Sequence, residues 1–153
     1  MSSASLNVPH FEQEFPHSCF AAVARMVLAF FSHPYTEAEL RAAMNTGSGG
    51  TRARDFLGLA KLGVEVKFVT SDLAGLFSFL TSNQPPIALL DTTWLPYWKD
   101  ICNHVAVVVA IDDSWVYLND PYFDSAPQQV SHSDFLTAWS SNSYTVALVR
   151  PRP

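Results

Sequence analysis

Apolar residues repeat at helical spacing through the first half of the chain. Between positions 20 and 31 they recur every three or four residues, and Ser18 is a favourable N-cap, so the pattern predicts a helix that begins at about Cys19. Four further elements are expected in this half: a capping-box helix over 36–44, a helix over 54–62 that ends at Gly63, a strand over 64–69 and a helix over about 71–81.

Strand patterns dominate the second half. A short apolar run over 87–90 predicts a buried strand, and the unbroken apolar run from His104 to Ile111 predicts a central strand covered on both faces. Three elements complete this half: an antiparallel strand over 115–119 after a turn at 112–114, a helix over 131–139 and a closing strand over 144–149. Helices first and a mostly antiparallel sheet second predict an α+β fold, which we expect to form one domain over residues 1–153.

Composition narrows the class of protein. Hydrophobic residues make up 48% of the 153 positions, which is enough to bury a core. The net charge is −5 and no block of Lys and Arg occurs, so nucleic-acid binding is not expected. The N-terminus lacks the pattern of a signal peptide, and no apolar run reaches the length of about 18 residues that a membrane helix needs. We therefore expect a soluble, cytoplasmic protein without a membrane segment, whose two cysteines stay reduced.

The first candidate for chemistry is Cys19, at the start of the first predicted helix. Free backbone N–H groups at a helix N-terminus stabilise a thiolate, which is the nucleophilic form of cysteine. Gln13 lies six residues upstream, where its side-chain N–H and the Cys19 backbone N–H could together hold a developing oxyanion. The alternative for Cys19 is a small buried hydrophobic residue.

The predicted hairpin supplies a base and a carboxylate. If the turn at 112–114 pairs Ile111 with Trp115, Ala106 lies opposite Asp120. His104 and Asp120 then project from one face, diagonally across the two strands at about 7–8 Å between backbones. A two-residue turn would place them on opposite faces. In the favourable register, a carboxylate, an imidazole and a thiol have the arrangement of nucleophilic acyl transfer.

These residues also have other interpretations. His104 alone could be an edge histidine bonded to backbone, and Asp120 a turn residue before proline. A zinc site is a second alternative, with the candidate ligands His17, Cys19, Cys102 and His104. A reversible disulfide between the two cysteines is a further hypothesis.

The order of these motifs resembles the papain-like cysteine peptidases of the C39 family and their stand-alone C39-like relatives. Gln13 precedes the cysteine by six positions, a histidine heads an apolar strand, and Asn119-Asp120-Pro121 ends the next strand; the similarity spans about residues 8–149. The resemblance implies a papain-like fold, with a helical half packed on the sheet. It also implies that Cys19 is the nucleophile, His104 the general base and acid, Asp120 the residue that orients His104, and Gln13 the oxyanion-hole donor.

The resemblance further implies hydrolysis of peptide or isopeptide bonds through a thioester, with a peptide or protein as partner and no cofactor or metal. The best-known C39 domains are fused to peptide-exporting ABC transporters and cut after a Gly-Gly motif, a substrate that we do not carry over to this chain. The sequence does not indicate an oligomeric state.

One departure from the family pattern concerns Phe20, because relatives usually have glycine directly after the cysteine. A large ring there suggests a narrowed cleft, a changed preference or a copy that has lost activity. The last alternative is a degenerate module that binds an extended peptide between Phe20 and the aromatic loop, which contains Trp94, Tyr97 and Trp98. We expect substrate preference to depend on that loop, over 91–103, and on the glycine-rich loop 47–50.

Overall fold

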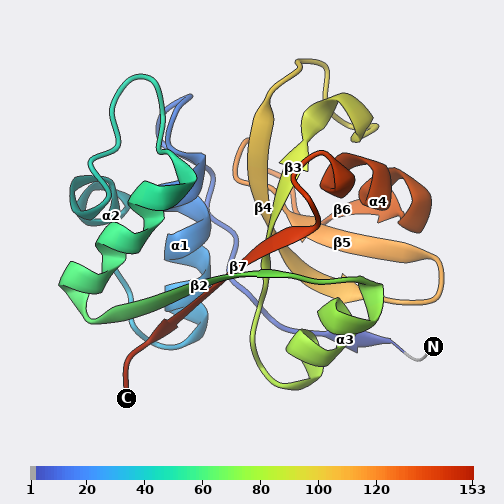
Figure 1. Ribbon diagram of the computed structural model, residues 1–153, viewed down its shortest axis with the longest axis horizontal. Helices are drawn as coiled ribbons and strands as arrows, with labels where there is room; N and C mark the ends of the chain where they lie inside the picture. The colour runs from blue at the N-terminus through green and yellow to red at the C-terminus, as the bar shows by residue number, and fades with distance from the viewer. Residues whose placement is uncertain (1–2) are drawn as a thin grey trace.

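A helical half stands beside a half built on a sheet in the computed structural model, which describes residues 3–153 (Figure 1). The helices lie at these positions: α1 Cys19–Phe30, α2 Glu37–Ala43, the 3-10 helix η1 Ala53–Leu62, α3 Leu73–Thr81, the 3-10 helix η2 Thr92–Trp94 and α4 His132–Ser140. The first three form the helical half, and α3 and α4 pack on the other face of the sheet.

The sheet has seven strands in the order β2-β7-β3-β4-β5-β6, and β1 pairs with β4. Their bounds are β1 Ala4–Ser5, β2 Val64–Thr70, β3 Ile87–Asp91, β4 Asn103–Ile111, β5 Trp115–Asn119, β6 Gln128–Ser131 and β7 Thr145–Pro151. Neighbouring strands pair antiparallel. The predicted α+β arrangement, with helices first and an antiparallel sheet second, is confirmed.

β4 is the wall between two hydrophobic cores. Val105, Val107 and Val109 face the core that includes α1. Ala106, Val108 and Ile111 face the core beneath α3 and α4. Because a strand alternates its side chains, a strand buried on both faces needs apolar residues at successive positions. The prediction of a central, doubly covered strand is therefore confirmed.

Most of the helix caps lie where the sequence predicts them. Thr36 and Glu39 form the predicted capping box, and Gly63 closes η1 in the left-handed region at φ 73°. Two details differ from prediction. The segment 53–62 is a 3-10 helix, and the Ser18 hydroxyl bonds to the Phe15 backbone although Ser18 occupies the predicted N-cap position.

The hairpin corrects one prediction and retains its consequence. Ile111 pairs with Val116, so the predicted pairing with Trp115 is wrong. A β-bulge between Val108 and Ala110 then adds one residue to β4 and shifts the register, and Val107 pairs with Asn119. Beyond the bulge the alignment is therefore the predicted one. Strands β1 and β6 were not predicted, because each is short and lacks a clear apolar alternation.

Candidate active site

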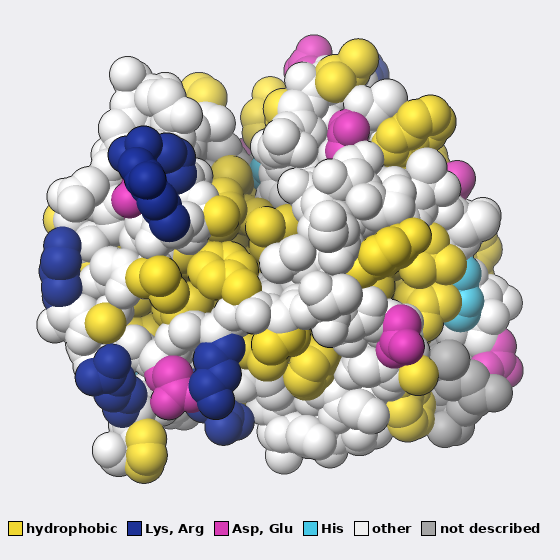
Figure 2. All heavy atoms as spheres, in the orientation of Figure 1, with side chains coloured by type: hydrophobic (Ala, Val, Ile, Leu, Met, Phe, Trp, Pro, Cys, Tyr) yellow, Lys and Arg dark blue, Asp and Glu magenta, His cyan; other side chains and the backbone are white. Residues whose placement is uncertain are grey.

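A cleft of about 680 Å³ lies between the two halves. Figure 2 shows the surface hollowed there, with hydrophobic side chains gathered between the halves. The helical half contributes these lining residues: Pro16, His17, Cys19, Phe20, Ser48, Gly49, Gly50, Thr51 and Ala53. The sheet half and its loops contribute Leu89, Trp98, Asp100, Cys102, Asn103, His104, Val105, Tyr122 and Asn142.

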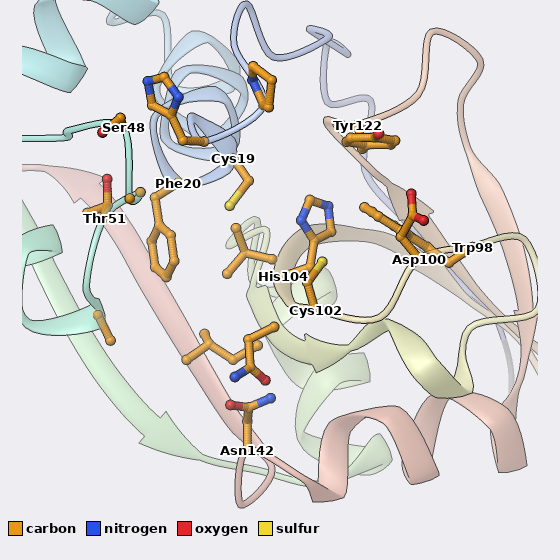
Figure 3. A pocket seen from close by; sticks show the side chains of 18 residues that line it. Cys19, Phe20, Ser48, Thr51, Trp98, Asp100, Cys102, His104, Tyr122 and Asn142 are labelled. Atoms are coloured by element: carbon orange, nitrogen blue, oxygen red, sulfur yellow. The ribbon is translucent and has the colours of Figure 1, made fainter.

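Cys19 and His104 reach into this cleft from opposite walls (Figure 3). Cys19 is the first residue of α1, as predicted, and its side chain is half-buried. His104 is only 5% exposed and lies near the start of β4, which packs against α1. The packing of one helix on one strand thus brings together a thiol and an imidazole that are 85 positions apart in sequence.

His104 bonds to Asp120 through its Nε2 atom, 2.7 Å from Asp120 Oδ1. This contact leaves Nδ1 as the ring nitrogen available to the thiol. Burial lowers the pKa of His104, but hydrogen bonds with Asp120 and Cys19, together with the charges of both groups, outweigh it and raise the pKa to about 9. The surroundings therefore favour the imidazolium form, which a thiolate would pair with.

Asp120 is fully buried and accepts four hydrogen bonds. Besides His104, the donors are the Tyr97 hydroxyl at 2.7 Å, the Trp98 indole N–H at 2.8 Å and the Tyr122 backbone N–H at 3.0 Å. Burial raises the pKa of Asp120, but the hydrogen bond and charge of His104 and the other donors outweigh it, so the pKa lies below its usual value. Asp120 is consequently a carboxylate that fixes the orientation of the imidazole.

The aromatic loop has a role that the sequence reasoning missed. Tyr97 and Trp98 were expected to contribute to substrate preference, and both donate hydrogen bonds to Asp120. Burial and the Asp120 charge raise the pKa of Tyr97, so its hydroxyl stays a donor. Trp98 packs edge-on against His104 with ring centroids 4.7 Å apart, and Tyr122 lies against Trp98 at 4.5 Å. These rings limit access of water to the His104–Asp120 pair.

The family model for the peptidase C39 family matches residues 7–151 of the chain. The chain belongs to the peptidase C39 family. Membership confirms the resemblance that the order of cysteine, histidine and aspartate indicated.

Three solved structures show the same fold. The peptidase domain of Streptococcus ComA, a bi-functional ABC transporter involved in a quorum sensing pathway, is 21% identical over 95% of this chain and 100% of its own, with a TM-score of 0.77. A putative C39-like peptidase from Bacillus anthracis is 18% identical over 100% of both chains, with a TM-score of 0.79. A double glycine motif protease from an AMS/PCAT transporter, in complex with the leader peptide, is 18% identical over 97% of this chain and 94% of its own, with a TM-score of 0.72. No curated protein sequence matches the chain.

Gln13 lies in the loop before α1 of this C39 chain, and its contacts run to both sides. Its backbone N–H donates to the Pro121 carbonyl at 2.7 Å, next to Asp120. Its side-chain Nε2 donates to the Phe15 carbonyl at 2.8 Å. The Gln13 backbone is therefore tied to the residue that follows Asp120, while the role of Gln13 as the oxyanion donor stays a prediction.

Two other cleft residues bear on the alternatives. Phe20 forms part of the wall and packs edge-on against Phe56 with ring centroids 5.1 Å apart, so much of its ring is anchored in the helical core.

Cys102 and Cys19 both line the cleft and are free thiols. Over residues 3–153 no three His, Cys, Asp or Glu side chains are grouped to hold a metal ion, which does not support the zinc alternative. None of the helices in that range is both long and apolar enough to cross a bilayer.

The raised pKa of His104 predicts a pH-dependent stability. Because the folded-state pKa of about 9 exceeds the unfolded value near 6.5, the folded protein holds the proton more tightly. The stabilisation is complete below pH 6.5 and is lost as pH rises through 9, with a limiting slope of about 1.4 kcal/mol per pH unit. Urea unfolding between pH 6 and 10 measures this effect. The free energy of unfolding of wild type should fall relative to that of His104→Gln as pH rises across this range. A stability difference that stays constant with pH would contradict this prediction.

Proposed function

We propose that the protein is a cysteine peptidase that hydrolyses peptide or isopeptide bonds through Cys19, His104 and Asp120. The observation that carries the proposal is the position of His104, which bonds to a buried carboxylate on one side and faces the Cys19 thiol across the cleft on the other. An oriented base beside a sulfur nucleophile is the arrangement that acyl transfer requires.

In the proposed reaction, the Cys19 thiolate attacks the scissile carbonyl carbon. Gln13 and the Cys19 backbone N–H hold the resulting oxyanion. The intermediate collapses as the C–N bond breaks, and protonated His104 gives its proton to the leaving amine. His104 then takes a proton from water, whose oxygen attacks the thioester carbon. The C–S bond breaks and releases the acid and the Cys19 thiolate beside protonated His104. Asp120 keeps Nδ1 of His104 directed at the sulfur throughout.

A peptide is the partner class that this proposal favours. One of the similar structures is a double glycine motif protease in complex with a leader peptide. Residues of both halves line the cleft, and Gly49 and Gly50 leave backbone without side chains on one wall. An extended peptide chain fits such a wall. We further propose a cytoplasmic location, because a reducing compartment keeps Cys19 available as a thiol.

A degenerate peptide-binding module remains the second candidate, and Phe20 is the observation that favours it. Its ring stands beside the nucleophile on the cleft wall. The two candidates differ in whether Cys19 and His104 work as a pair.

Alkylation by iodoacetamide tests this pairing without a known substrate. At pH 6 we expect Cys19 to label at least about tenfold faster than Cys102, since an imidazolium stabilises a neighbouring thiolate. Burial and nearby negative charges raise the pKa of Cys102, which makes it an internal control in the same cleft. His104→Gln should abolish the advantage of Cys19, as followed for each cysteine by mass spectrometry. Equal labelling of both cysteines in wild type would contradict the peptidase proposal.

A further inference from the structure

A buried carboxylate outside the cleft contacts the loop that leads to Cys19. Glu37 is the first residue of α2, and it is only 1% exposed. The mechanism above does not use it. In the sequence it stands inside a capping box, but the capping contacts are made by Thr36 and Glu39 and leave Glu37 free for another role.

The contacts of Glu37 converge on the segment 14–18. Its Oε1 accepts the backbone N–H of Glu14 at 3.0 Å, and the Ser18 hydroxyl lies against the same carboxyl group. Arg41, one helical turn further on, places its Nε 3.6 Å from Glu37 Oε2. Arg41 also donates to Glu14 Oε1 at 3.3 Å and covers the Phe15 ring at 4.5 Å. Glu37 and Arg41 together bind this segment to α2.

A carboxylate at this position is costly for the fold. Burial raises the pKa of Glu37, and the Glu14 N–H, the Ser18 hydroxyl and Arg41 counteract only part of that effect. A hydrophobic side chain would fill the same space without the desolvation cost. What it could not supply is an acceptor for the backbone N–H of Glu14.

The opposite side of the segment is held by the sheet half. The Gln13 backbone N–H donates to the Pro121 carbonyl at 2.7 Å, and the residue before Pro121 is Asp120. Successive amides of Gln13 and Glu14 are therefore bound in opposite directions, one to the sheet half and one to α2. The Gln13 side chain is held within the same segment by the Phe15 carbonyl.

We propose that Glu37 is a positioning residue that holds the segment 13–18 so that the Gln13 side chain and the Cys19 N–H serve one oxyanion. This inference rests on the proposed peptidase function. It predicts that Glu37 acts on the acyl-transfer step through Gln13 and leaves the reactivity of the sulfur itself unchanged.

A double-mutant cycle tests the proposal on the intact chain, with turnover of a quenched fluorescent peptide library as one measurement. Glu37→Ala should lower kcat at least about tenfold, because it displaces one oxyanion donor. Gln13→Ala should lower kcat by about 10²–10³, and adding Glu37→Ala to it should lower kcat less than twofold further. Glu37→Gln keeps an acceptor for the Glu14 N–H and should stay within about threefold of wild type.

Two further measurements separate positioning from general damage. Alkylation of Cys19 by iodoacetamide forms no oxyanion, so its rate should change less than about twofold in Glu37→Ala. Amide exchange of the Glu14 N–H, followed by NMR, should accelerate at least about tenfold in Glu37→Ala. Glu39→Ala removes a capping contact on the same helix and should leave both kcat and Glu14 exchange near wild type.

Unchanged Glu14 exchange in Glu37→Ala would overturn the proposal, and so would losses in kcat that multiply in the double variant. A parallel fall in Cys19 alkylation would also overturn it, because the effect would then reach the nucleophile. A wild type that turns over no peptide would refute the proposed function instead, and Glu14 exchange alone would then decide whether Glu37 holds the segment.

Discussion

Cys19→Ala should eliminate peptide hydrolysis, with a loss of turnover of about 10⁴-fold or more, as for removal of the nucleophile in other acyl-transfer enzymes. In the proposed mechanism the Cys19 sulfur is the atom that forms the thioester, and Cys19 is the thiol that hydrogen-bonds with His104. Cleavage of a peptide library, followed by mass spectrometry, measures the effect.

The matched control removes the other thiol of the cleft. Cys102→Ser should keep turnover within about tenfold of wild type, because Cys102 does not orient or protonate His104 in the mechanism. Both variants should retain the thermal stability of wild type within a few degrees, since small changes at half-buried or exposed positions cost little. Full turnover by Cys19→Ala would rule out the proposed mechanism.

Asp120→Ala should cause the largest loss of stability among the site variants, about 3–5 kcal/mol in the free energy of unfolding. The substitution leaves His104, Tyr97, Trp98 and the Tyr122 N–H without their acceptor in a buried place. Turnover should fall by about 10²–10⁴ without vanishing, because the nucleophile and base remain but the base loses its orientation. Urea unfolding and library cleavage measure the two effects.

Asp112→Ala is the control for this loss. Asp112 lies at the turn of the same hairpin and accepts hydrogen bonds from Ser114, Trp115 and Tyr117 near solvent. Water can replace the lost acceptor there, so the destabilisation should be clearly smaller and turnover should stay near wild type. Equal destabilisation by the two substitutions would mean that the buried network around Asp120 has no special weight.

Short-range signals made much of this site predictable. The N-cap position and helical spacing placed Cys19 at a helix start, and strand alternation placed His104 and Asp120 within reach of each other. These inferences succeed because helix and strand periods fix which side chains share a face. The order of the same residues then indicated the family.

Contacts between distant segments were beyond the reach of such patterns. The sequence around Tyr97 and Trp98 does not indicate that their polar atoms contact Asp120. A loop lacks the regular spacing of a helix or strand, so the directions of its side chains cannot be predicted from the sequence. Glu37 similarly looks like an ordinary first-turn acid of a helix. Its role becomes visible only when α2 packs beside the loop over 14–18.

The bulge in β4 separates two ends of the hairpin. The length of the turn can change at one end, while the strand register must stay fixed at the end that holds His104 and Asp120. A one-residue slip in an antiparallel pair would turn one member of the His104–Asp120 pair away from the other. Because the extra residue is accommodated at Val109, the strand register next to the turn and the register next to His104 and Asp120 are set separately. The exposed turn can therefore become longer or shorter during evolution, with compensation at the bulge, while His104 and Asp120 keep their hydrogen bond.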